Sequence, residues 1–191
     1  MINNIHPTAI IDDGALIGKN TYIWHWSHVS TNAKIGNNCN LGQNVFVAKN
    51  VSIGNYCKIQ NNVSLYEGLT LEDSVFCGPS VVFTNVINPR SQVNRKKEFK
   101  KTLVKQGTSI GANSTIICGI ILEKFSFIGA GAVVTKNTKS YALYVGNPAR
   151  QIGWISKNGH KLKLPLYGNG RTVCKYGRDE YFLENGICYS E

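Results

Sequence analysis

The sequence predicts an all-β fold in which the chain winds into a parallel β-helix, and three observations support this prediction. An apolar residue recurs at every sixth position over most of the chain. A small or β-branched residue follows almost all of these positions four residues later. A glycine or alanine often comes directly after the apolar residue, where a corner needs a tight backbone turn. A period of six is neither helical nor that of a simple strand, so it indicates a repeat architecture.

The apolar series runs from Ile5 to Phe83, stops, and resumes in a new phase at Val104. Each hexapeptide is expected to form one short strand and one corner, so three of them close a triangular coil of eighteen residues. Successive coils would stack at the strand spacing of about 4.8 Å. The series consists of Ile5, Ile11, Ile17, Ile23, Val29, Ile35, Leu41, Val47, Ile53, Ile59, Leu65, Leu71, Cys77 and Phe83, then Val104, Ile110, Ile116, Leu122, Ile128 and Val134.

This repeat, which covers roughly residues 5–140, resembles the left-handed parallel β-helix of the hexapeptide-repeat acyltransferases. The left hand is implied by the resemblance, because the period alone does not reveal it. The resemblance also implies an enzyme that uses acetyl-CoA as acetyl donor and assembles as a homotrimer with its sites between subunits. We expect a β-helix domain at residues 1–145, with a protruding loop at 86–103, and a C-terminal arm with a β-hairpin appendage at 146–191.

Composition narrows the class of partner. The 191 residues carry a net charge of +10, which favours phosphorylated small molecules, anionic membranes or nucleic acid. Direct nucleic-acid binding fits poorly, because no aromatic stacking platform accompanies the basic loop. No apolar run is long enough to span a membrane, and the polar start MINNIHPT does not resemble a signal peptide. The six cysteines form no CxxC or Cys/His cluster, so we expect reduced thiols, no metal and a cytoplasmic protein.

The segment FCGPSVVFTNVINPRSQVNRKKEFKKTLVKQGTSIGANSTIICG, at 76–119, gives the most specific resemblance. It resembles N-acetyltransferases that acetylate the 3-amino group of nucleotide-linked 3-amino sugars. One branch acts on UDP-2-acetamido-3-amino-2,3-dideoxyglucuronate and another on dTDP-3-amino-3,6-dideoxyhexoses. The tail GWISKNGHKL is similar to the uronate branch, which we favour, and this would place the protein in surface polysaccharide (lipopolysaccharide or O-antigen) biosynthesis.

Asn85 is the expected catalytic residue, since the resemblance implies that an asparagine positions the amine and that no histidine base is required. Glu67 lies eighteen residues before Asn85, so the two should stand at the same corner of successive coils. A carboxylate there attracts an ammonium group or accepts its hydrogen bond. The alternative for both residues is an ordinary polar corner.

The segment YIWHWSH gathers aromatic and imidazole groups outside the core. Trp24, Trp26 and His25 are therefore expected either at a subunit contact or in the wall of the nucleotide-sugar pocket, with His25 a weaker candidate for a catalytic base. Further expected substrate contacts are Tyr66 and, in the basic loop, Arg90 and Arg95. A long basic loop inside a tight repeat is usually functional, although it also fits a solvated surface loop.

For acetyl-CoA, the resemblance implies a groove along the coils that uses backbone groups. Lys136 and Arg150 are candidates for its phosphates, and Arg150 ends the stretch GNPAR, which resembles the exit motif of these enzymes. The corresponding coil positions are Gly111, Ala112, Gly129 and Ala130.

Other functions remain open at this stage. Within the class these are transfer to a 4-amino sugar or to serine. A carbonic anhydrase on the same helix needs three histidine ligands, and only His25 and His28 are suitably placed. An ice-binding solenoid would need regular threonine ladders, which this sequence lacks. A purely scaffolding solenoid would not need the basic loop.

Overall fold

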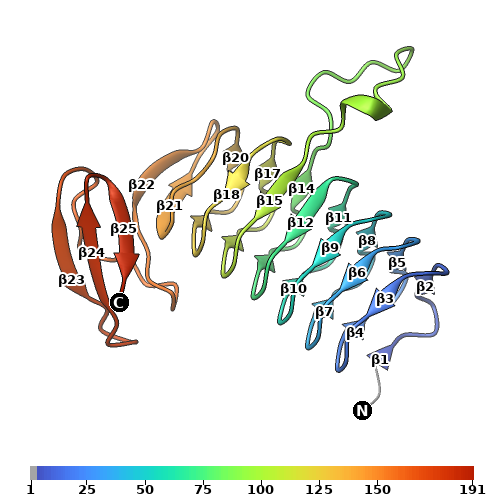
Figure 1. The fold of residues 1–191 in the computed structure, drawn as a ribbon, viewed down its shortest axis with the longest axis horizontal. Helices are drawn as coiled ribbons and strands as arrows, with labels where there is room; N and C mark the ends of the chain where they lie inside the picture. The colour runs from blue at the N-terminus through green and yellow to red at the C-terminus, as the bar shows by residue number, and fades with distance from the viewer. Residues whose placement is uncertain (1–3) are drawn as a thin grey trace.

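The computed structural model describes residues 4–191, so residues 1–3 of the predicted β-helix domain lie outside the described residues. The chain forms a parallel β-solenoid of about eight turns, consistent with left-handed winding (Figure 1). The prediction of an all-β hexapeptide solenoid is confirmed.

Three parallel sheets, here called A, B and C, form the sides of the solenoid. Sheet A contains β1 (Asn4–Ile5), β4 (Tyr22–Ile23), β7 (Asn40–Leu41), β10 (Lys58–Ile59), β13 (Phe76–Cys77), β16 (Ser109–Ile110), β19 (Phe127–Ile128), β21 (Ala142–Val145) and the antiparallel β22 (Arg150–Trp154). Sheet B contains β2 (Ile10–Ile11), β5 (His28–Val29), β8 (Phe46–Val47), β11 (Ser64–Leu65), β14 (Val82–Phe83), β17 (Thr115–Ile116) and β20 (Val133–Val134). Sheet C contains β3 (Leu16–Ile17), β6 (Lys34–Ile35), β9 (Ser52–Ile53), β12 (Leu69–Leu71), β15 (Thr102–Val104) and β18 (Ile121–Leu122).

The register follows the sequence period. Leu65 of β11 pairs with Val47, eighteen residues earlier, and each second strand residue points into the core. Phe83 instead pairs with Ile116, because the protruding loop is inserted into this coil. The apolar positions are buried from Ile23 onward, whereas Ile5 in the first coil is 37% exposed.

Buried hydroxyl groups form hydrogen bonds with backbone groups at the corners of the solenoid. Thr21 Oγ1 donates to the carbonyl of Gly36 (2.8 Å) and accepts from the amide of Cys39 (3.1 Å), and it is fully buried. Ser27 makes the equivalent pair of bonds with Gly42 and Val45. The small positions of the repeat therefore include groups that pair backbone atoms left over where the chain turns.

Thr21→Val should lower the free energy of unfolding by about 1–3 kcal/mol, because the isosteric side chain leaves the Cys39 amide without its partner inside the core. Chemical denaturation measures the change. The control Thr31→Val alters an exposed corner residue and should cost less than about 0.5 kcal/mol. Equal effects at both positions would contradict the role given to the buried hydroxyl.

The loop leaves sheet B after β14 and contains one short 3₁₀ helix, η1 (Lys96–Glu98). It stands away from the solenoid in Figure 1, between β14 and β15. The amide of Lys100 donates to the carbonyl of Asn85 (2.9 Å), which closes the base of the loop. The loop is thus a closed excursion from one corner, and the coils on either side stay in register.

The C-terminal segment forms a separate antiparallel sheet with the strands β23 (Gly170–Val173), β24 (Glu180–Glu184) and β25 (Ile187–Ser190). Asn185 and Gly186 make the turn between β24 and β25, both with positive φ. A second apolar core, which includes Tyr141, Trp154 and Tyr181, joins this sheet to the last coil. Of residues 4–191, none belongs to a helix long and apolar enough to cross a membrane.

Candidate active site

The three corners of the solenoid carry different side chains. Corner AB is the set of turns that lead from sheet A to sheet B, corner BC those from B to C, and corner CA those from C to A. All the predicted site residues of the coils lie on corners AB and BC. Corner CA instead carries a ladder in which the Oδ1 atoms of Asn37, Asn55 and Asp73 each accept from a backbone amide of the preceding coil.

Glu67 and Asn85 lie next to each other along corner BC. Ser64 pairs with Val82, so Glu67 and Asn85 occupy equivalent turns of successive coils, about 4.8 Å apart along the axis. Lys49, one coil earlier at the same corner, forms an ion pair with Glu67 (Nζ–Oε2 3.6 Å). The carboxylate therefore already lies beside a cation that a ligand ammonium could replace.

A hollow of about 420 Å³ opens at this corner. Glu67, Gly68 and Thr70 form its solenoid side, and Lys96, Phe99 and Lys101 of the loop form the other side. A second hollow of about 490 Å³ lies within the loop itself and shares Lys96 and Phe99 with the first. One carboxylate and two lysines thus border one hollow, which suits a ligand that carries both an ammonium and an anionic group.

Backbone bonds hold Asn85 at the base of the loop. The next coil donates from the amide of Cys118 to Thr84 Oγ1 (2.9 Å) and from the amide of Gly119 to Thr102 Oγ1 (3.1 Å). With the bond from Lys100 to the Asn85 carbonyl, both ends of the loop are fixed to neighbouring coils. The Asn85 side chain, which is half-buried, therefore projects from a well-supported turn.

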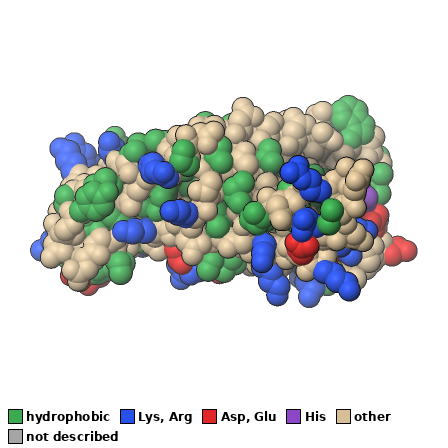
Figure 2. Space-filling model, turned by 90° about the horizontal axis from the view of Figure 1, so that it is seen from above, with side chains coloured by type: hydrophobic (Ala, Val, Ile, Leu, Met, Phe, Trp, Pro, Cys, Tyr) green, Lys and Arg blue, Asp and Glu red, His purple; other side chains and the backbone are tan. Residues whose placement is uncertain are grey.

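The loop concentrates positive charge. Figure 2, viewed from the side on which the loop projects in Figure 1, shows Lys and Arg side chains gathered around it. Arg95 Nη1 donates to both carboxylate oxygens of Glu98 (2.9 and 2.8 Å), so this arginine is engaged within the loop. Arg90 is exposed and lines the same loop hollow.

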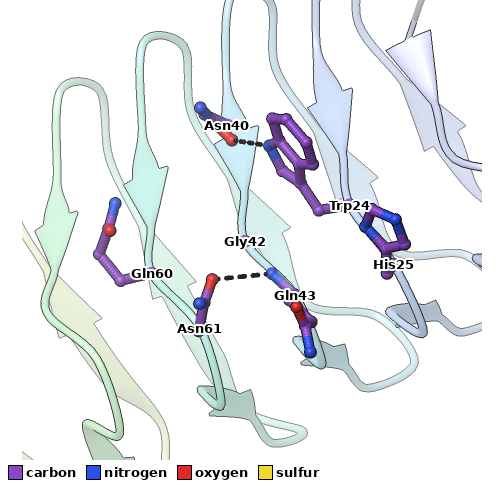
Figure 3. A pocket seen from close by; sticks show the side chains of 7 residues that line it. All are labelled: Trp24, His25, Asn40, Gly42, Gln43, Gln60 and Asn61. Atoms are coloured by element: carbon purple, nitrogen blue, oxygen red, sulfur yellow. Dashed lines mark hydrogen bonds between the residues drawn. The ribbon is translucent and has the colours of Figure 1, made fainter.

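The aromatic segment lies on corner AB. Trp24 and Trp26 are 46% and 61% exposed, and His25 stacks on His6 with ring centroids 3.5 Å apart. Trp24 and His25 line a hollow of about 360 Å³ that spans three coils (Figure 3). Within one chain, His25 is thus separated by one side of the solenoid from Glu67 and Asn85, whereas Tyr66 directly precedes Glu67.

The predicted coenzyme residues divide between the same two corners. Gly111 and Gly129, each followed by the predicted alanine, Ala112 or Ala130, form turns of corner AB. Lys136 lies at the far end of corner BC, and it lines a hollow of about 230 Å³ together with Tyr144 and with Arg150, the first residue of β22. Burial raises the pKa of the Tyr144 phenol, so this ring stays neutral and adds no negative charge beside the two cations.

No cluster of three or more His, Cys, Asp and Glu side chains that could hold a metal ion occurs in the described part of the chain. All six cysteines are free and buried. Burial raises the pKa of the Cys77 thiol to about 12, so this thiol remains protonated at neutral pH.

Sequence reasoning missed several neighbours of Glu67. Lys49 could have been found, because it precedes Glu67 by one eighteen-residue coil. Lys96, Phe99 and Lys101 could not be placed, since the loop has no period that fixes where its side chains point. A pair between His28 Nε2 and Asp12 Oδ1 (3.0 Å) on the outer face of sheet B was also not expected.

The coils match two descriptions of known repeats. Residues 14–49 and 32–66 match the bacterial transferase hexapeptide (six repeats), and residues 106–136 match the hexapeptide repeat of succinyl-transferase. Together with the parallel solenoid, these matches show that the coils consist of hexapeptide repeats.

Particular relatives narrow the comparison. The chain is 42% identical over 91 residues to the dTDP-3-amino-3,6-dideoxy-α-D-galactopyranose 3-N-acetyltransferase of Aneurinibacillus thermoaerophilus, a match that covers 48% of this chain and 45% of that protein. It is 31% identical over 97 residues to the bifunctional protein GlmU of Thermotoga maritima, a match that covers 48% of this chain and 22% of GlmU. The matches thus span less than half the length of these two relatives.

Among solved structures, the N-acyltransferase AntD of Bacillus cereus, in complex with dTDP and 3-hydroxybutyryl-CoA, superposes with a TM-score of 0.55. The identity is 18%, and the match covers 82% of this chain and 84% of AntD. At this identity the similarity supports the fold.

Proposed function

We propose that the protein is an acetyl-CoA-dependent N-acetyltransferase that acetylates the 3-amino group of a nucleotide-linked 3-amino-3-deoxy sugar. The main observation behind the proposal is the order in which an acidic residue, a carboxamide, a basic loop and a cationic hollow follow one another along corner BC. Glu67 and Asn85 stand beside the basic loop, and the hollow with Lys136 and Arg150 lies two coils further along the same corner. The curated relative with 42% identity has a name that describes this type of reaction.

In the proposed reaction, the sugar amine attacks the acetyl thioester, the carbon–nitrogen bond forms, and the carbon–sulfur bond breaks. Bound acetyl-CoA supplies the activated acetyl group. Glu67 attracts the amine as its ammonium, the ammonium releases one proton to solvent, and Glu67 then accepts a hydrogen bond from the neutral amine. The Asn85 amide holds the amine in line with the carbonyl carbon, and such positioning is a large part of catalysis in acyl transfer. No histidine base is invoked, and the amine proton finally goes to the departing thiolate.

The proposed assembly is a homotrimer with sites between subunits. The predicted substrate and coenzyme residues occupy two corners of one chain, AB and BC, and leave corner CA unused. A threefold arrangement in which corner AB of one copy faces corner BC of the next would join the two sets into one groove. Trp24 and His25 would then face Glu67 and Asn85 across the interface.

The coenzyme phosphates are proposed to lie against Lys136 and Arg150. Lys136→Gln or Arg150→Gln should raise KM for acetyl-CoA by roughly ten- to 150-fold, since each removes a charge-assisted hydrogen bond of about 1.5–3 kcal/mol. The KM for the amino sugar should stay within about twofold. Initial rates at varied acetyl-CoA measure the effect, with Lys124→Gln, an exposed lysine on corner CA, as the matched control. A rise in the sugar KM alone would contradict the assignment.

The favoured substrate is UDP-2-acetamido-3-amino-2,3-dideoxyglucuronate. Such a sugar carries an ammonium and a carboxylate, and the hollow at corner BC places Glu67 opposite Lys96 and Lys101. The relative with 42% identity supports the second candidate, a dTDP-3-amino-3,6-dideoxyhexose. These substrates suggest a cytoplasmic enzyme of surface glycan biosynthesis.

Thiol release from acetyl-CoA on addition of each nucleotide sugar tests the function. The uronate should give the highest kcat/KM, and a preference for the dTDP sugar would select the second candidate. Release with none of the 3-amino sugars would overturn the proposal.

A further inference from the structure

We infer that the hollow on corner AB binds the pyrimidine base of a nucleotide, and that it selects uracil or thymine over cytosine and adenine. The inference rests on the proposed function, because it deepens the description of the substrate. It concerns a place on the molecule distinct from corner BC, where the reaction is proposed to occur.

The hollow extends over three successive coils. Gly42 forms its floor, with Trp24 one coil before and Gln60 one coil after at equivalent turns (Figure 3). Two coil spacings separate these walls, about 9.6 Å along the axis, which leaves room for one flat ring against the indole. A glycine is required at this turn because the next coil approaches closely, and a Cβ on Gly42 would lie 2.8 Å from the backbone nitrogen of Asn61.

The lining is polar and carries no permanently charged group. Three of its members are Asn40, Gln43 and Asn61, and together with Gln60 they bring four carboxamides into one hollow. Only His25 among the seven lining residues is titratable. This composition is unsuited to phosphate or carboxylate, and it fits an uncharged ring with hydrogen-bonding edges.

Two hydrogen bonds fix which end of the amides is available. Trp24 Nε1 donates to Asn40 Oδ1 (2.8 Å), and the backbone amide of Gln43 donates to Asn61 Oδ1 (2.9 Å), as Figure 3 shows. An N–H donor can be met only by the amide oxygen, so the NH₂ groups of Asn40 and Asn61 remain to donate to a ligand. These two donors, one on β7 and one in the next turn of corner AB, suit the two carbonyl groups of uracil or thymine, which lie on opposite sides of the ring N3 atom. Cytosine and adenine present an amino group at one of these edges.

The indole supplies the stacking surface. Trp24 is 46% exposed, and its bond to Asn40 holds the ring against the sheet. Stacking of a base on an aromatic side chain contributes about 1–3 kcal/mol, which corresponds to roughly five- to 150-fold in affinity. The base would thus lie in the N-terminal coils, the coenzyme phosphates in the last coil, and Asn85 between them along the axis.

Direct binding of UDP and dTDP to the full-length protein, measured by isothermal titration calorimetry, tests the inference. Both should bind at least tenfold more tightly than CDP, ADP and ribose 5-phosphate, the last of which lacks a base. Trp24→Leu and Gln60→Leu should each raise the Kd of UDP and dTDP about tenfold and leave that of ribose 5-phosphate unchanged. The control Tyr56→Leu removes an exposed aromatic ring from corner CA and should have no effect.

The outcomes separate the base site from the proposed reaction. Equal binding of all the nucleotides, or binding that neither variant weakens, would overturn the base site, even if amino sugars are acetylated. Selective binding that both variants weaken would support it, even if no amino sugar is acetylated. Gln60→Leu changes a side chain for which no intramolecular hydrogen bond is seen in residues 4–191, so it provides a test if Trp24→Leu does not fold.

Discussion

Replacing Asn85 with alanine should lower kcat/KM for acetyl transfer about 100-fold or more while the protein stays folded. The carboxamide is proposed to hold the attacking amine, and loss of one positioned hydrogen-bonding group at an acyl-transfer site typically costs 10²–10³ in rate. The backbone bond from Lys100 reaches the Asn85 carbonyl, which alanine retains, so the base of the loop should persist.

The measurement is steady-state turnover of the preferred nucleotide sugar, with the melting temperature as the test of folding. Thr31→Ala is the matched control, because Thr31 occupies the equivalent turn of corner BC in an earlier coil and is exposed. It should keep near-normal turnover. Asn85→Ala turnover within about threefold of the unaltered protein would refute the assignment of Asn85.

Glu67→Gln should show a different pattern. It removes the negative charge that attracts the ammonium but keeps a hydrogen-bond acceptor, so the loss should fall mainly on KM for the amino sugar. It also separates Lys49 from its ion-pair partner, which should change stability little because Lys49 is exposed.

The period of six was sufficient to predict the fold because each hexapeptide buries its own apolar residue. Ile59 and Leu65 are completely buried as expected, and Cys39 and Cys57 stack inside adjacent coils. The same arithmetic could also have assigned the corners. His25 precedes Glu67 by two coils and one further hexapeptide, which places it one corner away, on AB.

The loop limits what register can predict. Phe83 pairs with Ile116, so the spacing between Asn85 and Lys136 is no multiple of eighteen, although both lie on corner BC. Their sequence spacing can be converted into a number of coils only when the length of the inserted loop is known. The hollow beside Glu67 depends on the path of the loop, which is set by the bond between Lys100 and Asn85 across its base and by the bonds of Thr84 and Thr102 with the next coil.

The assignment of site residues to two corners predicts a second large effect. Two variants that are each inactive should regain acetyltransferase activity when they are co-expressed and form mixed trimers. Ala130→Trp on corner AB should obstruct the proposed coenzyme groove, and Asn85→Ala impairs corner BC. If each site combines corner AB of one copy with corner BC of the next, a mixed trimer contains one site in three with both corners intact. Random mixing makes three quarters of the trimers mixed, so co-expression should restore about one quarter of the activity of the unaltered protein.

Co-expression with two different affinity tags and sequential purification isolates the mixed trimers, in which recovery should approach one third of the unaltered activity. The control pairs Asn85→Ala with Glu67→Gln, which both alter corner BC, so no mixed trimer gains an intact site and activity should not exceed the average of the two variants. If both corners of one chain served the same site, the Ala130→Trp and Asn85→Ala pair would also stay inactive. No single chain in either mixture has both corners intact. If activity recovers in the first pair and does not exceed the average in the second, corner AB of one copy must therefore meet corner BC of another.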